Sequence, residues 1–483
     1  MTLIKYLTKI LLIALVLFAF ISKGQINPDF KRSYHWYFGN NAGLDFTTGS
    51  PIIDLNSQMH QHETGSVMSD SLGNLLFYTD GDTVWNKNHQ IMPNGKGLVN
   101  CESASQGGLI LKKPHSNSMY YIFTNDCQEN NGVSGIHYSL IDMSLNGGLG
   151  DVSIKNTLLF APSTEKISAV YHCNNNDIWI VSQIRNSNSF CAYLIDNNGV
   201  STTPIITNIG SVHNDEGFSS DSGGLLKFSP DGTKLAVTYV FYPNSKVELF
   251  DFNSNTGNIS NFISLPSDTS SYGVSFSPDN SKLYISAGSG GSIQNKILQY
   301  DLSLTNAPSI IASRYPIYIM PSLMNNPILG LELAPNSKIY GARFGLDSLS
   351  AINNPNSAGA SCNFVLNSIS LQGRKSNETL PQYIQNYFNT GTQTICTTGI
   401  NNYTTQNEIS LFPVPANQTF FINSSENYVK IEAVSILGII TELNIVRQNS
   451  SYSIDVQLLN TGLYTLYLKT KDNTFIKKIS IIH

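Results

Sequence analysis

Three copies of one short pattern constrain the fold of this chain most. The copies begin at Phe228, Phe276 and Leu333, and each reads as a strand, a Pro-Asp or Pro-Asn turn and a second strand. Proline fixes φ in the turn and Asp or Asn tolerates the left-handed corner, so each copy is predicted to be a β-hairpin. The first two copies lie 48 residues apart and the third follows after 57. A period of this length, with about four short strands per repeat and no helical pattern, is the sequence signature of a β-propeller.

The same succession of strands continues upstream in a more degenerate form. Three further blades are predicted over residues 66–85, 108–141 and 167–195. A seventh sheet can be assembled from residues 36–47 and 380–388, which would join the beginning of the domain to its end and remove the free sheet edges. We therefore predict an all-β chain in which residues 25–388 form a seven-bladed propeller, with six blades as the alternative.

The N-terminus has the features of a secretory signal. Two lysines precede an apolar run of about a dozen residues from Ile10 to Ile21, and small residues follow before Gln25. A transmembrane anchor is the alternative, but a spanning helix needs roughly 20 apolar residues. We expect residues 1–24 to be removed, the mature chain to begin at Gln25, and no transmembrane span to remain.

Composition indicates a large globular protein. Hydrophobic residues make up 41% of the chain and charged residues only 13%, with a net charge of −5. Solubility must therefore come from the abundant Asn, Ser and Thr. The sequence has no cluster of basic residues that would indicate a nucleic-acid partner.

The six cysteines all follow the signal, and disulfides persist outside the cytoplasm. Six cysteines allow fifteen pairings, so their number alone does not give the connectivity. A predicted hairpin lies between the first two, and the last two bracket the end of the propeller, which favours the pairs Cys101–Cys127, Cys362–Cys396 and, by elimination, Cys173–Cys191. Free buried thiols are the alternative.

The last seventy-odd residues carry a recognisable set of short motifs. The segment opens on Phe412, Pro413, Pro415, Ala416 and Asn417, and continues through Val434–Gly438 to Ile454, Asp455, Gly462, Leu463, Tyr464, Lys477, Lys478 and Ile479. These motifs resemble the type A C-terminal sorting domain of the type IX secretion system of Bacteroidota, although Val414 stands where that family usually has Asn. The resemblance implies a small Ig-like β-sandwich over residues 408–483, a secretion translocon as partner, and a location outside the cell or on the outer-membrane surface.

The region before this tail carries three sequence strings that resemble those of a known group of propellers. The strings WYFGNNAGLDF, LFYTDG and LPQYIQNYF are similar to WD-repeat or quinoprotein-like propellers of secreted Bacteroidota proteins, over residues 34–390. Such a resemblance implies architecture and location more than chemistry. Residues 389–407 are rich in Thr and Asn, which is typical of a linker.

Acidic residues stand just ahead of the first strand of successive predicted blades. They are Glu63, Glu102, Glu165, and Asp215 and Glu216 with Asp221. The segments that enter the innermost strands of a propeller surround one mouth of its channel, so Glu63, Glu102, Glu165 and Glu216 are the candidate binding residues. Such a ring could bind Ca²⁺, hold sugar hydroxyls or, in pairs, support acid–base hydrolysis. The alternative is that each acid is individually solvated.

The sequence offers little sign of catalysis. There is no Gly-x-Ser-x-Gly elbow, which excludes an α/β-hydrolase. His60 and His62 lie close to Glu63, but no third metal ligand is fixed nearby. We predict a secreted or cell-surface propeller that binds an extracellular protein or glycan, without catalytic residues and without a cofactor other than a possible Ca²⁺. A hydrolase or lyase acting on extracellular polysaccharide is the alternative.

Overall fold

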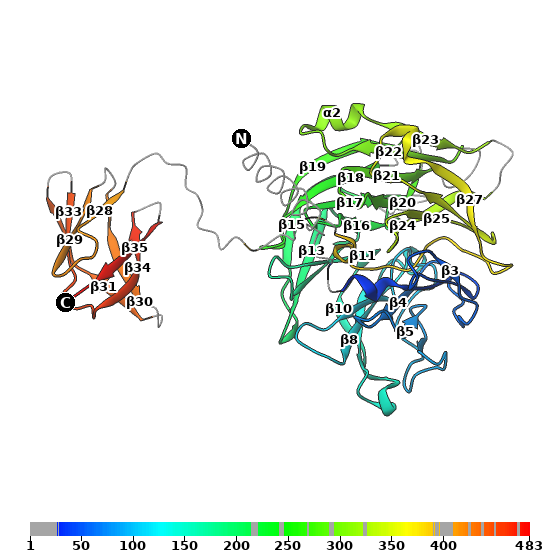
Figure 1. Ribbon diagram of the computed structural model, residues 1–483, viewed down its shortest axis with the longest axis horizontal. Coiled ribbons are helices and arrows are strands. Elements are labelled where there is room, and N and C mark those ends of the chain that lie inside the picture. Colours follow the sequence, from blue (N-terminus) through cyan, green and yellow to red (C-terminus); the bar gives the residue numbers. More distant parts are fainter. Residues whose placement is uncertain are drawn as a thin grey trace, which may run out of the picture. The chain divides into compact units, whose positions relative to one another are not determined.

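The protein is described by a computed structural model (Figure 1). The described residues are 27, 29–213, 221–240, 246–267, 270–288, 294–321, 326–389, 391, 396, 409–423, 427–435, 439–448, 451–470 and 474–483. The predicted signal peptide, most of the predicted linker, and Asp215 and Glu216 lie outside them. The chain divides into two compact units, residues 1–395 and 396–483, and each is treated by itself.

The described part of the first unit contains seven antiparallel sheets that follow one another in chain order. The first four consist of β1 (His35–Phe38), β2 (Ala42–Asp45) and β3 (Ile52–Ile53); β4 (Ser66–Ser69), β5 (Leu75–Thr79) and β6 (Val84–Asn86); β7 (Leu109–Lys112), β8 (Met119–Asn125), β9 (Ile136–Asp142) and β10 (Asp151–Phe160); and β11 (Ser163–Tyr171), β12 (Ile178–Ile184), β13 (Ser189–Asp196), β14 (Gly199–Val200) and β15 (Ile205–Asn208).

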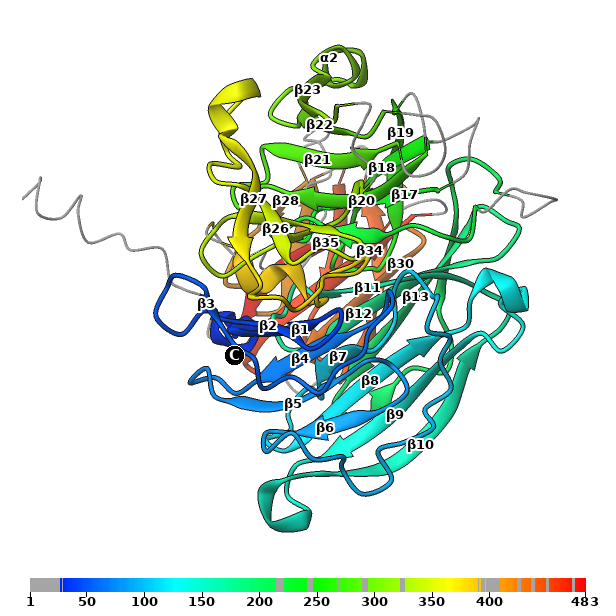
Figure 2. The ribbon, with the colours of Figure 1, turned by 90° about the vertical axis from the view of Figure 1, so that its right-hand side faces the viewer.

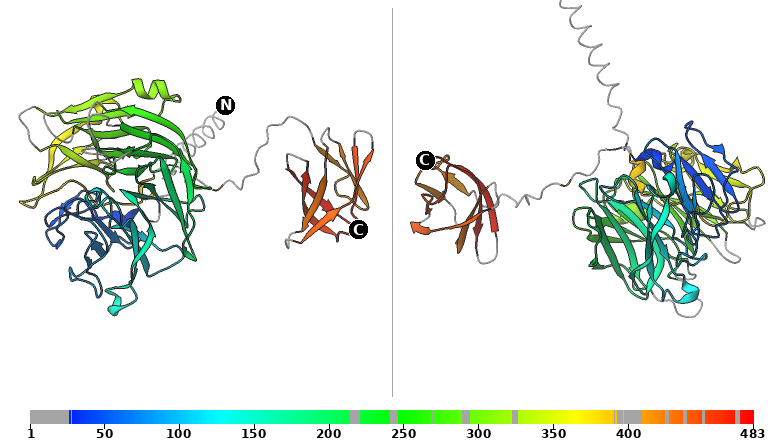
Figure 3. Two further views of the ribbon diagram at one scale, coloured as in Figure 1. Left: turned by 180° about the vertical axis from the view of Figure 1, so that it is seen from behind. Right: turned by 90° about the horizontal axis from the view of Figure 1, so that it is seen from below.

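The other three sheets have four strands each. They consist of β16 (Leu226–Phe228), β17 (Lys234–Thr238), β18 (Lys246–Phe252) and β19 (Ile259–Pro266); β20 (Ser271–Phe276), β21 (Lys282–Ala287), β22 (Lys296–Asp301) and β23 (Tyr315–Ile319); and β24 (Ile328–Leu333), β25 (Ile339–Arg343), β26 (Ser348–Ile352) and β27 (Phe364–Ser370). Figures 1 and 3 show the sheets arranged around a ring in the order of the colour scale. The fold of this unit is therefore a β-propeller.

The remaining elements of this unit are short helices between or beside the sheets. They are η1 (Phe30–Ser33), η2 (Gln128–Asn130), η3 (Asn146–Gly148), α2 (Ala307–Ala312), η4 (Gly359–Cys362) and η5 (Gln385–Phe388). Across the described residues, no helix is both long enough and apolar enough to cross a membrane.

The predicted Pro-Asp hairpins are present, and their side chains show why they form. In the hairpin of β16 and β17, the Ser229 amide donates to the carbonyl of Lys234 at 3.0 Å. The Ser229 hydroxyl donates to Asp231, and the same carboxylate accepts from the amide of Thr233 at 3.0 Å. A Ser, Pro and Asp in succession thus satisfy the polar groups of the turn locally.

Residues 377–389 are called the central segment from here on, and the strand predicted within them for residues 380–388 does not form. They contain η5 and are almost entirely buried, and they bond to sheets on several sides of the ring. Hydrogen bonds join the segment to the carbonyl of His35, the hydroxyl of Ser66, the amide of Tyr171 and the carboxylate of Glu332. The segment therefore occupies the middle of the ring.

The prediction that Trp36–Phe38 and Tyr383–Tyr387 share a sheet is thus wrong. The aromatic residues of the central segment are buried on every side, and its amide side chains replace the hydrogen bonds of a ladder. The first and last sheets are neighbours in the ring (Figure 2). The rings of Trp36 and Phe46 lie 6.0 and 6.2 Å from that of Tyr340, and the Asn40 amide donates to the Lys375 carbonyl at 2.9 Å.

The second unit contains two four-stranded antiparallel sheets over one hydrophobic core. One sheet has the order β28 (Ser410–Phe412), β29 (Thr419–Asn423), β33 (Ser451–Asp455) and β32 (Ile445–Gln448), and the other β31 (Ile440–Leu443), β30 (Lys430–Ser435), β34 (Gly462–Lys469) and β35 (Thr474–Ile481). The core takes Ala416 from the opening motif and Ile479 and Ile481 from the last strand. The more specific prediction, an Ig-like fold for this sandwich, stays a prediction.

The cysteines correct two of the predicted pairs. Cys101 and Cys127 form the predicted disulfide. Cys191 and Cys362 are buried free thiols, so the pairs Cys173–Cys191 and Cys362–Cys396 are wrong; Cys173 and Cys396 are each disulfide-bonded.

Strand register explains why Cys173 does not pair with Cys191. Cys191 faces Ser182, which faces Ile167, in neighbouring strands. Cys173 lies six residues beyond Ile167, or about 20 Å along an extended chain. This distance is far too long for a disulfide.

Candidate functional site: a carboxylate-lined cavity

A cavity of about 330 Å³ opens where the chain enters the innermost strands of the propeller. Glu63 precedes β4, Ser105 precedes β7, and Tyr272 lies at the start of β20. The full lining comprises Glu63, Ser103, Ser105, Gln128, Glu129, Glu165, Gly223, Val240, Tyr272, Pro327, Leu329, Phe344 and Glu378. Because the central segment fills the middle of the ring, the cavity is a hollow at one mouth and not part of an open channel.

The Glu63 carboxylate lies close to the ring axis. Its side chain comes from the second sheet, and its Oε2 accepts a hydrogen bond of 2.5 Å from the Tyr272 hydroxyl of the sixth sheet. These sheets are not neighbours, so this bond spans the mouth. The other oxygen, Oε1, lies 3.8 Å from Nδ1 of His62.

The environment of the cavity favours the protonated forms of its acids. Burial raises the pKa of Glu63 well above its usual value, repulsion from Glu378 adds to the rise, and the Tyr272 hydrogen bond opposes it. Burial also raises the pKa of Glu378, which His62 opposes and Glu165 reinforces. Carboxyl groups held this close together cannot all remain charged at low cost unless a cation joins them.

Glu165 has a structural part in the cavity wall. One of its oxygens accepts from the amide and hydroxyl of Ser105 at 3.1 and 2.7 Å, and the other accepts from the amide of Gln128 at 2.8 Å. Burial raises the pKa of Glu165, and these hydrogen bonds oppose the rise. The carboxylate therefore ties together two loops that the Cys101–Cys127 disulfide also joins.

The structure brings together two of the four acids singled out in the sequence. Glu63 and Glu165 line the cavity, whereas Glu102 is exposed and outside the lining, with its carbonyl accepting from the Glu63 amide at 3.3 Å. Glu216 lies outside the described residues. Asp221, named with it, faces His213, with 3.4 Å between Oδ2 and Nδ1.

Sequence reasoning missed Glu129, Tyr272 and Glu378. Tyr272 stands at the entry to an inner strand, so the rule that selected the acids would have found it had hydroxyls been included. Glu378 belongs to the central segment, whose position depends on tertiary packing, and no local signal marks it.

The expected Ca²⁺ stays a prediction. Within the part of the chain that the structure describes, no group of three His, Cys or carboxylate ligand atoms within 4.8 Å of one another includes Glu63, Glu165 or Glu378. Calcium takes six to eight oxygen ligands at 2.3–2.6 Å. These side chains would have to move closer together to share an ion.

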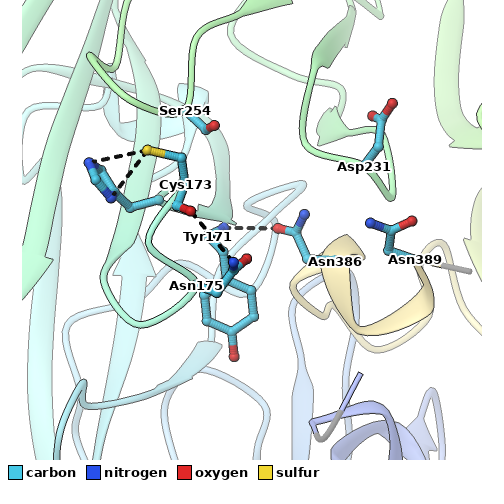
Figure 4. Close-up of a pocket in the computed structure, with 8 residues that line it drawn as sticks. Tyr171, Cys173, Asn175, Asp231, Ser254, Asn386 and Asn389 are labelled. Carbon is cyan, nitrogen blue, oxygen red and sulfur yellow. Dashed lines mark hydrogen bonds between the residues drawn. The ribbon is translucent and has the colours of Figure 1, made fainter. Parts of the chain in front are cut away.

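A second hollow lies at the opposite end of β11 from Glu165 (Figure 4). Its volume is about 10 Å³, which is room for about one water molecule. The Tyr171 amide donates to Asn386 there at 2.8 Å. This hollow is a packing gap beside the central segment and too small for an organic ligand.

Comparison with known proteins identifies the tail. Residues 410–482 match the secretion system C-terminal sorting domain. In this stretch, Phe412 ends β28 and is 49% exposed, whereas Ala416 is buried and bonds through its amide to the carbonyl of Ser480. The protein is thus a β-propeller exported by type IX secretion to the cell surface or the extracellular space.

Solved structures resemble the chain only distantly. They include the hydrazine synthase of Kuenenia stuttgartiensis, with 13% identity, a TM-score of 0.38, and coverage of 72% of this chain and 99% of that one. The Swd1 β-propeller domain of Myceliophteria thermophila has 9% identity and a TM-score of 0.39, covering 65% and 94%. The periplasmic gluconolactonase of Pseudomonas aeruginosa has 10% identity and a TM-score of 0.35, covering 83% and 93%. No curated protein matches the chain.

Proposed function

We propose that the exported propeller binds an extracellular glycan in the carboxylate-lined cavity. The observation that carries this proposal is the shape and chemistry of the hollow, which is a concavity of about 330 Å³ with clustered acceptor oxygens and an apolar side. The sequence left a protein or a glycan open as partner. The cavity favours the glycan, because protein partners usually need a much broader interface.

The lining has the groups that sugar recognition needs. Carboxylates of Glu63 and Glu378 can accept hydrogen bonds from sugar hydroxyls, and Ser103 adds a hydroxyl. Phe344, 42% exposed, offers an apolar surface to the C–H face of a sugar ring. The hydrogen bonds of Glu63 and Glu165 across and around the mouth hold these groups in place before a ligand arrives.

A glycan array probed with the mature full-length protein tests this proposal. We expect binding that weakens at least tenfold in Glu378→Gln, while Glu102→Gln binds like the unmodified protein because Glu102 is outside the lining. A protein pull-down under the same conditions covers the other partner. The proposal fails if no glycan binds, or if both variants bind equally well.

The second candidate is a hydrolase or lyase acting on polysaccharide, and the raised pKa of Glu63 favours it. Glu63 and Glu378 both line the cavity and both have raised pKa values, and a pair of carboxyl groups can act as general acid and general base. Any glycan that binds should therefore be incubated with the protein and analysed for shortened or unsaturated products. Turnover lost in Glu63→Gln would establish catalysis, and an unchanged glycan would leave a binding protein.

A further inference from the structure

We infer that the glycan held in this cavity carries a free amino group, so that the ligand is an amino sugar bound as its ammonium ion. This inference rests on the proposed function and narrows it to one chemical class. It follows from the charge of the lining, from one oxygen of Glu63 and from the apolar side of the hollow.

The charges of the lining are strongly one-sided. Four glutamates border the cavity, and the described lining includes neither lysine nor arginine. Lys166, the neighbour of Glu165 in the sequence, directs its ammonium group at the carbonyls of Asp221 and Ser222 and lies over the ring of Tyr239 at 4.5 Å. Its charge lowers the pKa of Glu165 and so offsets the charge of that one glutamate in part. A neutral sugar would leave the pKa values of Glu63 and Glu378 raised, whereas an ammonium group beside these carboxyl groups would favour their ionised forms.

Glu63 gives the ammonium group a position. The residue is only 7% exposed, and Oε2 already accepts from Tyr272. Oε1 accepts no hydrogen bond from the described residues, and His62 approaches it only to 3.8 Å. The Glu63 side chain is 10% exposed and lines the cavity, so Oε1 has room to accept a hydrogen bond from a ligand. An ammonium group supplies three N–H donors as well as the missing charge.

The apolar part of the lining explains why the amine should belong to a sugar. It consists of Val240, Pro327, Leu329 and Phe344, and the Phe344 ring lies 5.8 Å from that of His62. A compact inorganic cation would leave these side chains without a partner, whereas a sugar ring can lay its C–H face against them while its hydroxyls meet Ser103 and Gln128.

Binding of a cation here should release protons. Burial raises the pKa values of Glu63 and Glu378, and repulsion from neighbouring carboxyl groups adds to both rises, so these groups keep their protons to a higher pH than ordinary glutamates do. An ammonium group beside them lowers both pKa values and expels protons into solution. Affinity should consequently rise with pH as long as the amine itself stays protonated.

The test uses two ligands that differ at the amino group, namely glucosamine oligomers with charged ammonium groups and the same oligomers N-acetylated, whose amides are neutral and bulkier. Isothermal titration calorimetry on the mature protein should show at least tenfold tighter binding of the free-amine oligomer. Repeating the titration in buffers of different ionisation enthalpy should reveal proton release. Glu63→Gln and Glu378→Gln should each abolish most of the preference for the amine, with Glu102→Gln as the matched control.

The outcomes separate this inference from the proposed function. Equal binding of both oligomers would overturn the amino-sugar assignment and leave glycan binding intact. Binding of neither oligomer, with other glycans bound on an array, would overturn it as well. If putrescine binds as tightly as the glucosamine oligomer, the cavity recognises amines in general and the sugar part is wrong. A preference that survives in both variants would locate the site elsewhere.

Discussion

The ion pair of Lys227 and Glu332 ties two sheets to the central segment, so Lys227→Met should destabilise the whole propeller. The Lys227 Nζ lies 2.6 Å from Glu332 Oε2 and also donates to the Leu331 carbonyl, and Gln385 donates to the other oxygen of Glu332. Both charged side chains are about 95% buried. Removing one partner of a buried pair costs about 3–5 kcal/mol. Burial raises the pKa of Glu332, so it can take up a proton, and this holds the cost toward the lower end.

Calorimetry of the mature protein measures the effect. The unfolding entropy of a domain of roughly 360 residues is about 0.76 kcal/mol/K, so a loss of about 3 kcal/mol lowers Tm by about 4 °C. Lys234→Met is the matched control from the same hairpin, because Lys234 pairs with Asp251 at the surface, where the two side chains are 36% and 34% exposed. An exposed pair is worth about 0–1 kcal/mol. The double variant Lys227→Met/Glu332→Gln should recover part of the loss. Equal Tm values for the two single lysine variants would refute this account of the ring.

Three further predictions address stability and export. The folded protein keeps protons on Glu63 and Glu378 to a higher pH than the unfolded chain, whose glutamates have the ordinary pKa of 4.5. The contribution of these two groups to stability therefore falls as the pH rises above 4.5. The Tm of Glu63→Gln should consequently depend less on pH than the Tm of the unmodified protein. Gly39→Ala should destabilise the propeller by several kcal/mol in urea titrations. The φ angle of Gly39 is +55°, and the new Cβ would lie 2.1 Å from the carbonyl oxygen of Lys375. A loss of under about 1 kcal/mol would contradict the packing described. Deleting Thr474–His483 removes β35 and two core residues of the sorting domain. Cell fractionation should then find a folded propeller retained in the periplasm. Normal surface display of this variant would contradict the export route.

Much of the ring could be predicted from the sequence because its hairpins are local. The turns after Phe228 and Phe276 carry Ser, Pro and Asp, which satisfy the turn with side chains a few residues away. The central segment could not be predicted in this way. Its Tyr, Ile and Phe residues read as a strand, yet they are buried, and partners from distant parts of the chain, Glu332 for Gln385 and Pro230 for Asn386, come only with the assembled sheets.

The candidate site was partly predictable for a related reason. Glu63 and Glu165 precede inner strands, so the geometry of a propeller brings both to one mouth. The same rule selected Glu102, whose side chain is exposed outside the lining, because loop conformation and not blade order decides which way an entry residue faces. Glu378 reaches the cavity through the central segment, which becomes visible only in three dimensions.

A crystal structure of the mature protein with the tightest glycan from the array tests the central claim most directly. We expect the ligand in the hollow beside Glu63 and Phe344, with one of its N–H or O–H groups donating to Oε1 of Glu63 and a ring face against Phe344. A ligand bound on the outer strands of a sheet or on the sorting domain, with this hollow unchanged, would contradict the proposal that the carboxylate-lined cavity is the binding site.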